Sequence, residues 1–153
     1  MKIIFLDIDG VLNSVAYDRS RTADDGNIDE SRLVLLRELV EQTGARLVLT
    51  SSWRSHWDPL GEKTDAVGKE LEAVFTRKGL QLFYRTSLTV KERAAGILAW
   101  LAQHDVAAYV IIDDLKLGWG ALEAHVVKTD PRIGRGLGSA HVREAIRILN
   151  QAD

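Results

Sequence analysis

The sequence contains no cysteine, and this absence removes several kinds of site at once. Disulfide bonds, thiolate-bound zinc and cysteine nucleophiles are all excluded. No apolar run is long enough to span a bilayer, and the short run Ile3 to Leu6 leads into acidic residues, unlike a signal peptide. The net charge of -2 gives no overall attraction to nucleic acid or to anionic membranes. We therefore expect a cytoplasmic protein that does not bind membranes.

Strand-like and helix-like stretches alternate along the chain, which indicates an α/β fold. Short apolar runs predict strands at residues 3–6, 47–49, 80–84, 109–112 and 125–127. Apolar residues at helical spacing predict helices at about 27–44 and 64–78, from 89 onward, and at 139–150. This order is typical of βαβ units, so we expect a mostly parallel sheet with helices on both faces. There is no internal repeat, low-complexity segment or linker, and 153 residues suit one domain, residues 1–153.

Three local features refine these expectations. Asn27 with Glu30, and Thr89 with Glu92, have the spacing of a capping box at the start of a helix. The polar stretch from Ser14 to Gly26 is expected to form a loop or a small flap. The four tryptophans also raise the question of base stacking. For Trp53, close to the predicted site, both stacking on a base and simple packing are open, and packing is favoured.

Asp7 and Asp9 follow the first apolar run and precede Gly10, which suits a tight turn. A carboxylate that directly follows a buried strand lies at its carboxyl end, the edge where open α/β sheets bind ligands. Two carboxylates one residue apart can share a metal ion and divide nucleophilic from acid–base work. This arrangement favours phosphoryl chemistry. The alternative is a pair of solvated aspartates in a turn.

Further polar residues follow other apolar runs. Thr50 and Ser51 come after the second strand, and Asp113 and Asp114 come after a later one. Because right-handed βαβ connections place the ends of parallel strands on one edge, these groups should converge with the first aspartates. Lys91 joins them if the start of its helix faces the same edge.

In this order the residues resemble the haloacid dehalogenase (HAD) superfamily of phosphohydrolases. The resemblance rests on residues 7–11, on Thr50 or Ser51, on Lys91, and on the pair 113–114, so it spans nearly the whole chain. More narrowly, residues 9–13 with 50–54 resemble the HAD domain of RNA repair proteins and the phosphatase half of polynucleotide kinase-phosphatases. The resemblance implies a three-layer, Rossmann-like HAD core, and the short inserts imply a minimal cap or none.

The resemblance also implies roles for the acidic residues. Asp7 is the nucleophile that forms an aspartyl-phosphate, and Asp9 protonates the leaving oxygen and then activates water. Mg²⁺ is the implied cofactor, because hard cations take oxygen ligands. Asp7, the backbone carbonyl of Asp9, and one or both of Asp113 and Asp114 are the implied ligands.

The phosphate-binding residues remain open at this stage. Thr50 directly follows its apolar run, which favours it over Ser51 as the hydroxyl that donates to a phosphate oxygen. Lys91 is favoured for the positive charge, and Arg93 aligns about as well in the RNA-repair branch. Arg54 is either a bidentate phosphate clamp or a surface arginine in a turn.

We therefore expect a Mg²⁺-dependent phosphomonoesterase with an open site. An open site suits phosphorylated substrates such as nucleic-acid ends, and it also admits nucleotides. A receiver-type signalling domain carries similar residues, but its acidic pair lies near the N-terminus and its phospho-accepting aspartate lies on a middle strand. A non-catalytic phosphate-binding module is the third possibility. Every catalytic position is filled in this sequence, so nothing in it favours that alternative.

Overall fold

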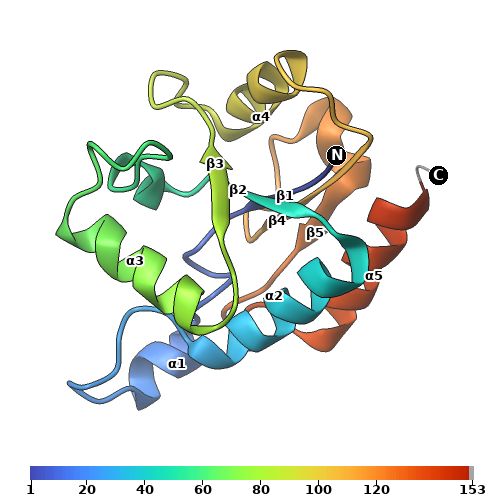
Figure 1. The fold of residues 1–153 in the computed structure, drawn as a ribbon. Coiled ribbons are helices and arrows are strands. Elements are labelled where there is room, and N and C mark those ends of the chain that lie inside the picture. Colours follow the sequence, from blue (N-terminus) through green and yellow to red (C-terminus); the bar gives the residue numbers. More distant parts are fainter. Residues whose placement is uncertain (152–153) are drawn as a thin grey trace.

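A parallel five-stranded sheet forms the centre of the computed structural model, which describes residues 1–151 (Figure 1). The strand order is β3-β2-β1-β4-β5, and every neighbouring pair is parallel. The strands are β1 (Lys2–Leu6), β2 (Arg46–Leu49), β3 (Leu82–Arg85), β4 (Ala108–Asp113) and β5 (Val126–Lys128). The prediction of an α/β, Rossmann-like sheet is confirmed.

Helices follow the strands along the chain and cover both faces of the sheet (Figure 1). None of the helices within residues 1–151 has the length and apolar character needed to cross a membrane. The α-helices are α1 (Val15–Ser20), α2 (Glu30–Thr43), α3 (Ala66–Arg77), α4 (Arg93–Ala102) and α5 (Ser139–Gln151). Two 3-10 helices, η1 (Ser52–Ser55) and η2 (Gly120–His125), follow β2 and precede β5.

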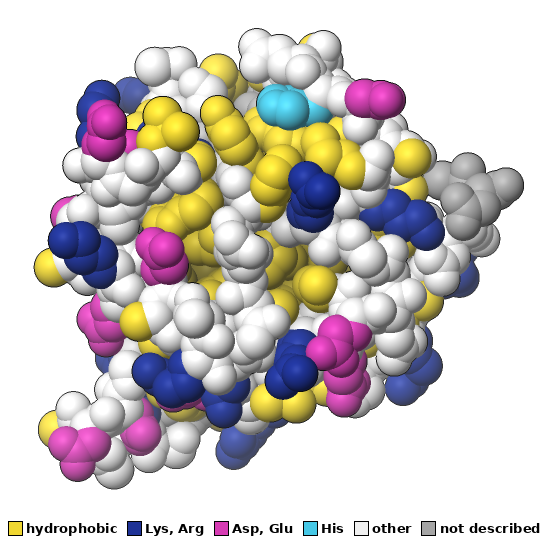
Figure 2. All heavy atoms as spheres, viewed as in Figure 1, with side chains coloured by type: hydrophobic (Ala, Val, Ile, Leu, Met, Phe, Trp, Pro, Cys, Tyr) yellow, Lys and Arg dark blue, Asp and Glu magenta, His cyan; other side chains and the backbone are white. Residues whose placement is uncertain are grey.

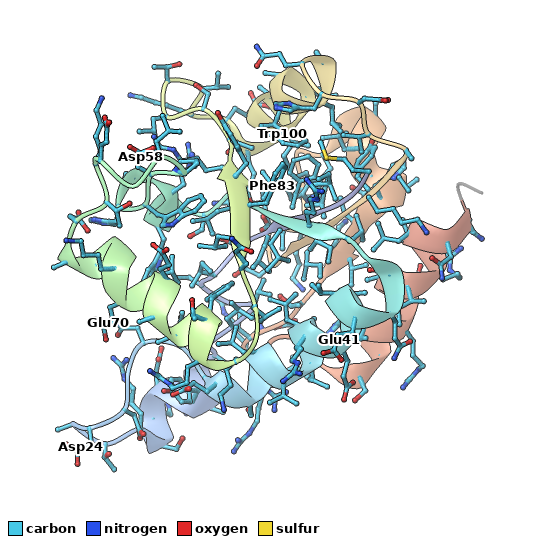
Figure 3. The ribbon with its side chains drawn as sticks, in the orientation of Figure 1. Asp24, Glu41, Asp58, Glu70, Phe83 and Trp100 are labelled. Carbon is cyan, nitrogen blue, oxygen red and sulfur yellow. The ribbon has the colours of Figure 1, made fainter. Side chains whose placement is uncertain are left out.

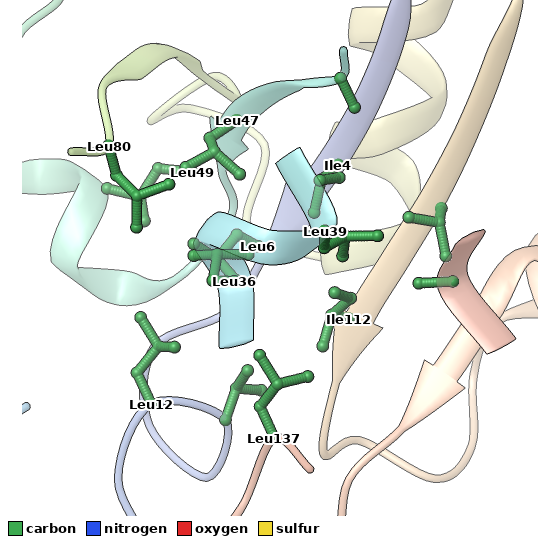
Figure 4. Close-up of a cluster of buried hydrophobic side chains, with 14 of the residues drawn as sticks. Ile4, Leu6, Leu12, Leu36, Leu39, Leu47, Leu49, Leu80, Ile112 and Leu137 are labelled. Carbon is green, nitrogen blue, oxygen red and sulfur yellow. The ribbon is translucent and has the colours of Figure 1, made fainter. Parts of the chain in front are cut away.

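Successive residues of β1 pack on opposite faces of the sheet, as the two-residue period of a strand requires. Ile4 and Leu6 belong to a core cluster with α2, α3 and α5 (Figure 4). Ile3 and Phe5 belong to a second cluster with α4 and η2. The second cluster also includes Trp100 of α4, which is buried. Two buried faces hold the strand ends in a fixed frame.

Both predicted capping boxes are wrong. The N-cap of α2 is Asp29, whose side chain accepts a hydrogen bond from the backbone N–H of Ser31. Asparagine is about as strong an N-cap as aspartate, but the side-chain oxygen of Asn27 accepts a hydrogen bond from Arg21 Nη1 at 2.6 Å instead. At α4 the N-cap is Glu92, and its side chain makes no capping bond. The backbone N–H of Thr89 bonds to Ser87 instead, in the turn before the helix.

The segments that follow β1 and β2 are short, and the described part of the chain contains no separate cap domain. The stretch expected to be a loop or flap begins with α1, which was not predicted. The Ser14 side chain caps α1 by accepting from the backbone N–H of Tyr17. A loop then leads to Ile28, which is buried in the core. The carboxyl edge of the sheet is therefore bordered by loops and by the short helices α1 and η1.

Candidate active site

The carboxyl ends of β1, β2 and β4 lie side by side, because Leu6 pairs with Leu49 on one side and with Ile112 on the other. The residues that follow these strands extend the pairing. The backbone N–H of Asp7 donates to the carbonyl of Ile112 at 3.1 Å, and that of Thr50 donates to the carbonyl of Leu6 at 3.0 Å. The chain thus brings its acidic and hydroxyl groups to one edge.

Asp7, Asp113 and Asp114 form an acidic cluster at this edge. Each offers a carboxylate oxygen, and these oxygens lie within 4.8 Å of one another. Asp113 is fully buried and Asp7 is 4% exposed, so water screens their charges little. Three carboxylate oxygens are the hard donors that Mg²⁺ prefers. The residues present therefore fit a magnesium ion.

Arg93, the first residue of α4, is the cation that faces this cluster. Its Nη1 lies 2.8 Å from Oδ2 of Asp113 and 3.2 Å from Oδ2 of Asp7. Lys91 is exposed, and it takes part in none of the ion pairs found among residues 1–151. Of the two candidates left open by the sequence, Arg93 is the one that lies beside Asp7.

Burial raises the pKa of two carboxyl groups at this edge, those of Asp7 and Asp113. It raises the pKa of Asp7 from 3.8 to about 7, with a further rise from the charge of Asp113 and an opposing effect of Arg93. Burial also raises the pKa of Asp113, against the attraction of Arg93. One guanidinium does not compensate three carboxyl groups. A bound cation would therefore be favourable here.

The raised pKa of Asp7 predicts how stability of the metal-free protein depends on pH. Between about pH 4 and pH 7 the folded state holds a proton that the unfolded state releases, so the free energy of unfolding falls as pH rises through this range. Asp7→Asn removes this cost, and in EDTA at pH 8 we expect it to stabilise the protein by about 2–4 kcal/mol. Urea unfolding at pH 5 and pH 8 measures both effects. An equal or lower stability of the variant at pH 8 would contradict the account.

Asp9 is exposed, and both oxygens of its carboxylate accept hydrogen bonds. Asn13 Nδ2 donates to Oδ1 at 2.9 Å, and Trp53 Nε1 donates to Oδ2 at 3.2 Å. Asn13 is itself fixed, because its Oδ1 accepts from the backbone N–H of Gly10 at 2.8 Å. Sequence reasoning gave neither Asn13 nor Trp53 this role. Their signals in the sequence were weak: an asparagine four residues after Asp9, and one tryptophan among four.

Gly10 allows the tight turn that directly follows Asp7 and Asp9. Its φ is +83°, and a Cβ at this position would lie 2.3 Å from Oδ2 of Asp114. Its carbonyl accepts a hydrogen bond from the hydroxyl of buried Thr129 at 2.8 Å. Both the backbone conformation and the close approach of Asp114 therefore require glycine.

We expect Gly10→Ala to displace Asp114 and to lower Mg²⁺ affinity by at least about tenfold, in addition to about 1–3 kcal/mol of backbone strain. Gly44→Ala is the matched control, because Gly44 also has a positive φ of +69° but has open space around its Cβ position. It should lose stability and keep its Mg²⁺ affinity. Calorimetric titration with Mg²⁺ and thermal unfolding separate the two effects; equal Mg²⁺ affinity in the two variants would contradict this role.

The two candidate hydroxyls differ in their hydrogen bonding. Ser51 Oγ accepts from the backbone N–H of Trp53 at 3.2 Å and caps η1. Thr50 Oγ1 is buried and has no hydrogen-bond partner among residues 1–151. A buried hydroxyl without a partner is costly unless a ligand supplies one. The geometry therefore favours Thr50 as the phosphate donor.

Arg54 connects the loop after β2 to the segment before α4. Its Nη1 donates to the carbonyls of Thr50 at 3.3 Å and Ser51 at 3.2 Å, and its Nη2 donates to that of Val90 at 3.4 Å. Burial, with the charges of Arg93 and Arg85, lowers its pKa. In this conformation the Arg54 guanidinium binds backbone carbonyls of both segments. A role for Arg54 as a phosphate clamp stays a prediction.

Residues 3–142 match the family described as the HAD domain in Swiss Army Knife RNA repair proteins. The chain belongs to this HAD family. Comparisons with curated proteins and with solved structures found no match. Membership agrees with the cap-free Rossmann-like HAD core and supports a HAD-type hydrolase, a class that is generally metal-dependent. The acidic cluster of this HAD domain offers three carboxylate oxygens as ligands for such a metal.

Proposed function

We propose that this HAD domain is a Mg²⁺-dependent phosphomonoesterase that acts through an aspartyl-phosphate on Asp7. The observation that carries the proposal is the position of Asp7. Its carboxylate is buried at the end of β1, within reach of Arg93 and beside Asp113 and Asp114. A carboxylate held between a cation and a metal-binding cluster is suited to attack an anionic phosphate.

The reaction has two steps. A carboxylate oxygen of Asp7 attacks phosphorus as the bond to the leaving oxygen breaks, and Asp9 gives that oxygen a proton. Water then attacks the same phosphorus while Asp9 takes its proton, which releases inorganic phosphate and restores Asp7. The hydrogen bonds from Asn13 and Trp53 keep the Asp9 carboxyl oriented for both transfers. Thr50 and Arg93 would bind phosphate oxygens.

Asp7, Asp113, Asp114 and the backbone carbonyl of Asp9 are the groups that would hold Mg²⁺. When bound, the ion offsets the repulsion between carboxylate and phosphate and stabilises negative charge in the transition state. Phosphorylated nucleic-acid ends and nucleotides are the proposed substrates, supported by the family description and by the absence of a cap domain in residues 1–151. One domain over residues 1–153 and a cytoplasmic location stay predictions.

The direct test is hydrolysis of a generic aryl phosphate with and without metal. We expect turnover in the presence of Mg²⁺, loss of at least about 100-fold in EDTA, and recovery when Mg²⁺ is added back. Undiminished turnover in EDTA would contradict metal dependence. No turnover under any of these conditions would contradict the phosphomonoesterase itself.

A further inference from the structure

A cavity of about 410 Å³ lies between the loop that follows α1 and one face of α3. This volume is typical of sites for small molecules. Part of its wall is apolar or aromatic, formed by Trp53, Ile28, Val67, Leu71 and Val74. Figure 3 shows the two sides of this region, with Asp24 on the loop and Glu70 on α3.

Two residues of the cavity wall connect it to Asp9, the residue proposed as proton donor. Trp53 lines it and donates to Oδ2 of Asp9 at 3.2 Å. Asn27 also lines it, and its carbonyl accepts from Nδ2 of Asn13 at 3.1 Å, the same nitrogen that holds Oδ1 of Asp9. Both links run to Asp9. Asp9 itself does not line the cavity, so the cavity lies one hydrogen-bonded residue away from the proposed proton donor.

Tyr17 fixes the loop side of this wall. Its hydroxyl lies 2.7 Å from the carbonyl of Gly26 and 3.0 Å from that of Ile28, so it can donate to either. On the opposite side, Glu70 Oε1 would lie 4.0 Å from a Cβ at Gly26. The loop and α3 thus face each other across a short distance.

The charged side chains that line the cavity are mostly acidic: Asp24, Asp25, Asp29, Glu30 and Glu70. Arg77 is the basic side chain among the lining residues. Arg77 is already paired with Glu30, at 3.2 Å. Asp29 is more than nine-tenths buried, and its Oδ2 has no hydrogen-bond partner in the described part of the chain. Its cation, Arg32, is 3.7 Å away. Acidic side chains are also visible on the loop at the lower left of Figure 2.

We propose that this cavity receives the leaving group of the substrate and selects one with apolar surface and positive rather than negative charge. The inference rests on the proposed phosphomonoesterase, because it takes Asp9 as the proton donor. Trp53 offers an aromatic surface, and the surrounding carboxylates attract a cation and repel an anion.

This selection narrows the proposed substrates. A nucleoside is uncharged and can pack on an aromatic ring, whereas a strand adds one negative charge with every phosphate. The acidic wall therefore favours nucleotides over nucleic-acid ends whose strand would continue through the cavity. A compact phosphomonoester with an ammonium group on its leaving alcohol should be favoured further.

A matched pair of substrates tests the proposal. Both 4-(aminomethyl)phenyl phosphate and 4-(carboxymethyl)phenyl phosphate insulate the charge from the phenol by a methylene group, so size and leaving-group basicity are similar. With Mg²⁺ at low ionic strength, we expect kcat/KM to be about tenfold higher for the cationic substrate, and high salt should reduce this ratio. A ratio near one, or a preference for the anionic substrate, would overturn the proposal.

Two variants locate the source of the preference. Asp24→Asn combined with Glu70→Gln should bring the ratio toward one, since both side chains are exposed and line the cavity. Glu72→Gln is the control, because Glu72 is exposed on the same helix but lies outside the lining of this cavity. A preference that survives the double variant, or that falls equally in the control, would overturn the proposal.

If neither substrate is hydrolysed, the proposed function fails, and a binding measurement decides the cavity separately. The probe is 4-(aminomethyl)phenol, followed by the indole N–H signal of Trp53 in ¹⁵N-labelled protein and assigned with Trp53→Phe. A saturable shift that weakens in the double variant and is absent with 4-hydroxyphenylacetate supports the cavity as a cation site. No saturable shift overturns it.

Discussion

Asp7→Asn is expected to lower kcat for aryl phosphate hydrolysis by at least about 1,000-fold while the protein stays folded. The reason is chemical, since an amide does not form the acyl phosphate. The reason is not structural, since the buried carboxyl of Asp7 costs stability at neutral pH, and the amide removes that cost. Steady-state kinetics with saturating Mg²⁺, together with circular dichroism, makes the measurement.

The matched control for this loss is Asp105→Asn, which changes an exposed aspartate in the loop between α4 and β4. It should change kcat by about twofold at most, and the free energy of unfolding by about 0.5 kcal/mol at most. Robust turnover by purified Asp7→Asn would contradict the nucleophile assignment, because the reaction would then have to use a nucleophile other than Asp7.

Arg93→Ala is expected to have the second large effect. It also distinguishes Arg93 from Lys91, the two residues that the sequence left open as the phosphate-binding cation. Loss of the guanidinium leaves Asp7 and Asp113 without their cation in a buried site. In EDTA at pH 8 we expect a loss of about 3 kcal/mol in the free energy of unfolding. With Mg²⁺, kcat/KM should fall by about 100-fold, because the variant also lacks the positive charge that would bind the phosphate oxygens.

Lys91→Ala is the comparison that makes this result informative. Lys91 is exposed two residues before Arg93, and we expect its removal to change kcat/KM by about threefold at most. Urea unfolding and substrate titration of both variants give the answer. A larger catalytic loss in Lys91→Ala than in Arg93→Ala would show that the side chain beside Asp7 is not the phosphate-binding cation.

The sheet could be predicted from sequence because its strands are buried on both faces and read as uninterrupted apolar runs, as in Ile3 to Leu6. Parallel order then places the strand ends on one edge, so the approach of Asp7 to Asp113 followed from topology alone. The helix starts were less predictable. Capping depends on which of several nearby polar residues reaches the free backbone N–H groups, and Asp29 does so in place of Asn27.

The finer parts of the site depend on side-chain geometry that spacing does not determine. Whether Lys91 or Arg93 meets the acidic cluster depends on where α4 begins and which way its first turn faces. The contact between Trp53 and Asp9 joins residues from two different strand ends, so no local pattern carries it. The cavity beside Asp9 likewise forms only when the loop after α1 meets α3.

The most direct measurement of the central claim is detection of the aspartyl-phosphate itself. The protein is mixed with an aryl phosphate and Mg²⁺, quenched in acid during turnover, digested, and analysed by peptide mass spectrometry. We predict a phosphoryl group on Asp7, in larger amount in Asp9→Asn, where water activation is impaired, and none in Asp7→Asn. An active protein whose phosphoryl group is found on another residue, or on none in both the unaltered protein and Asp9→Asn, would contradict the account.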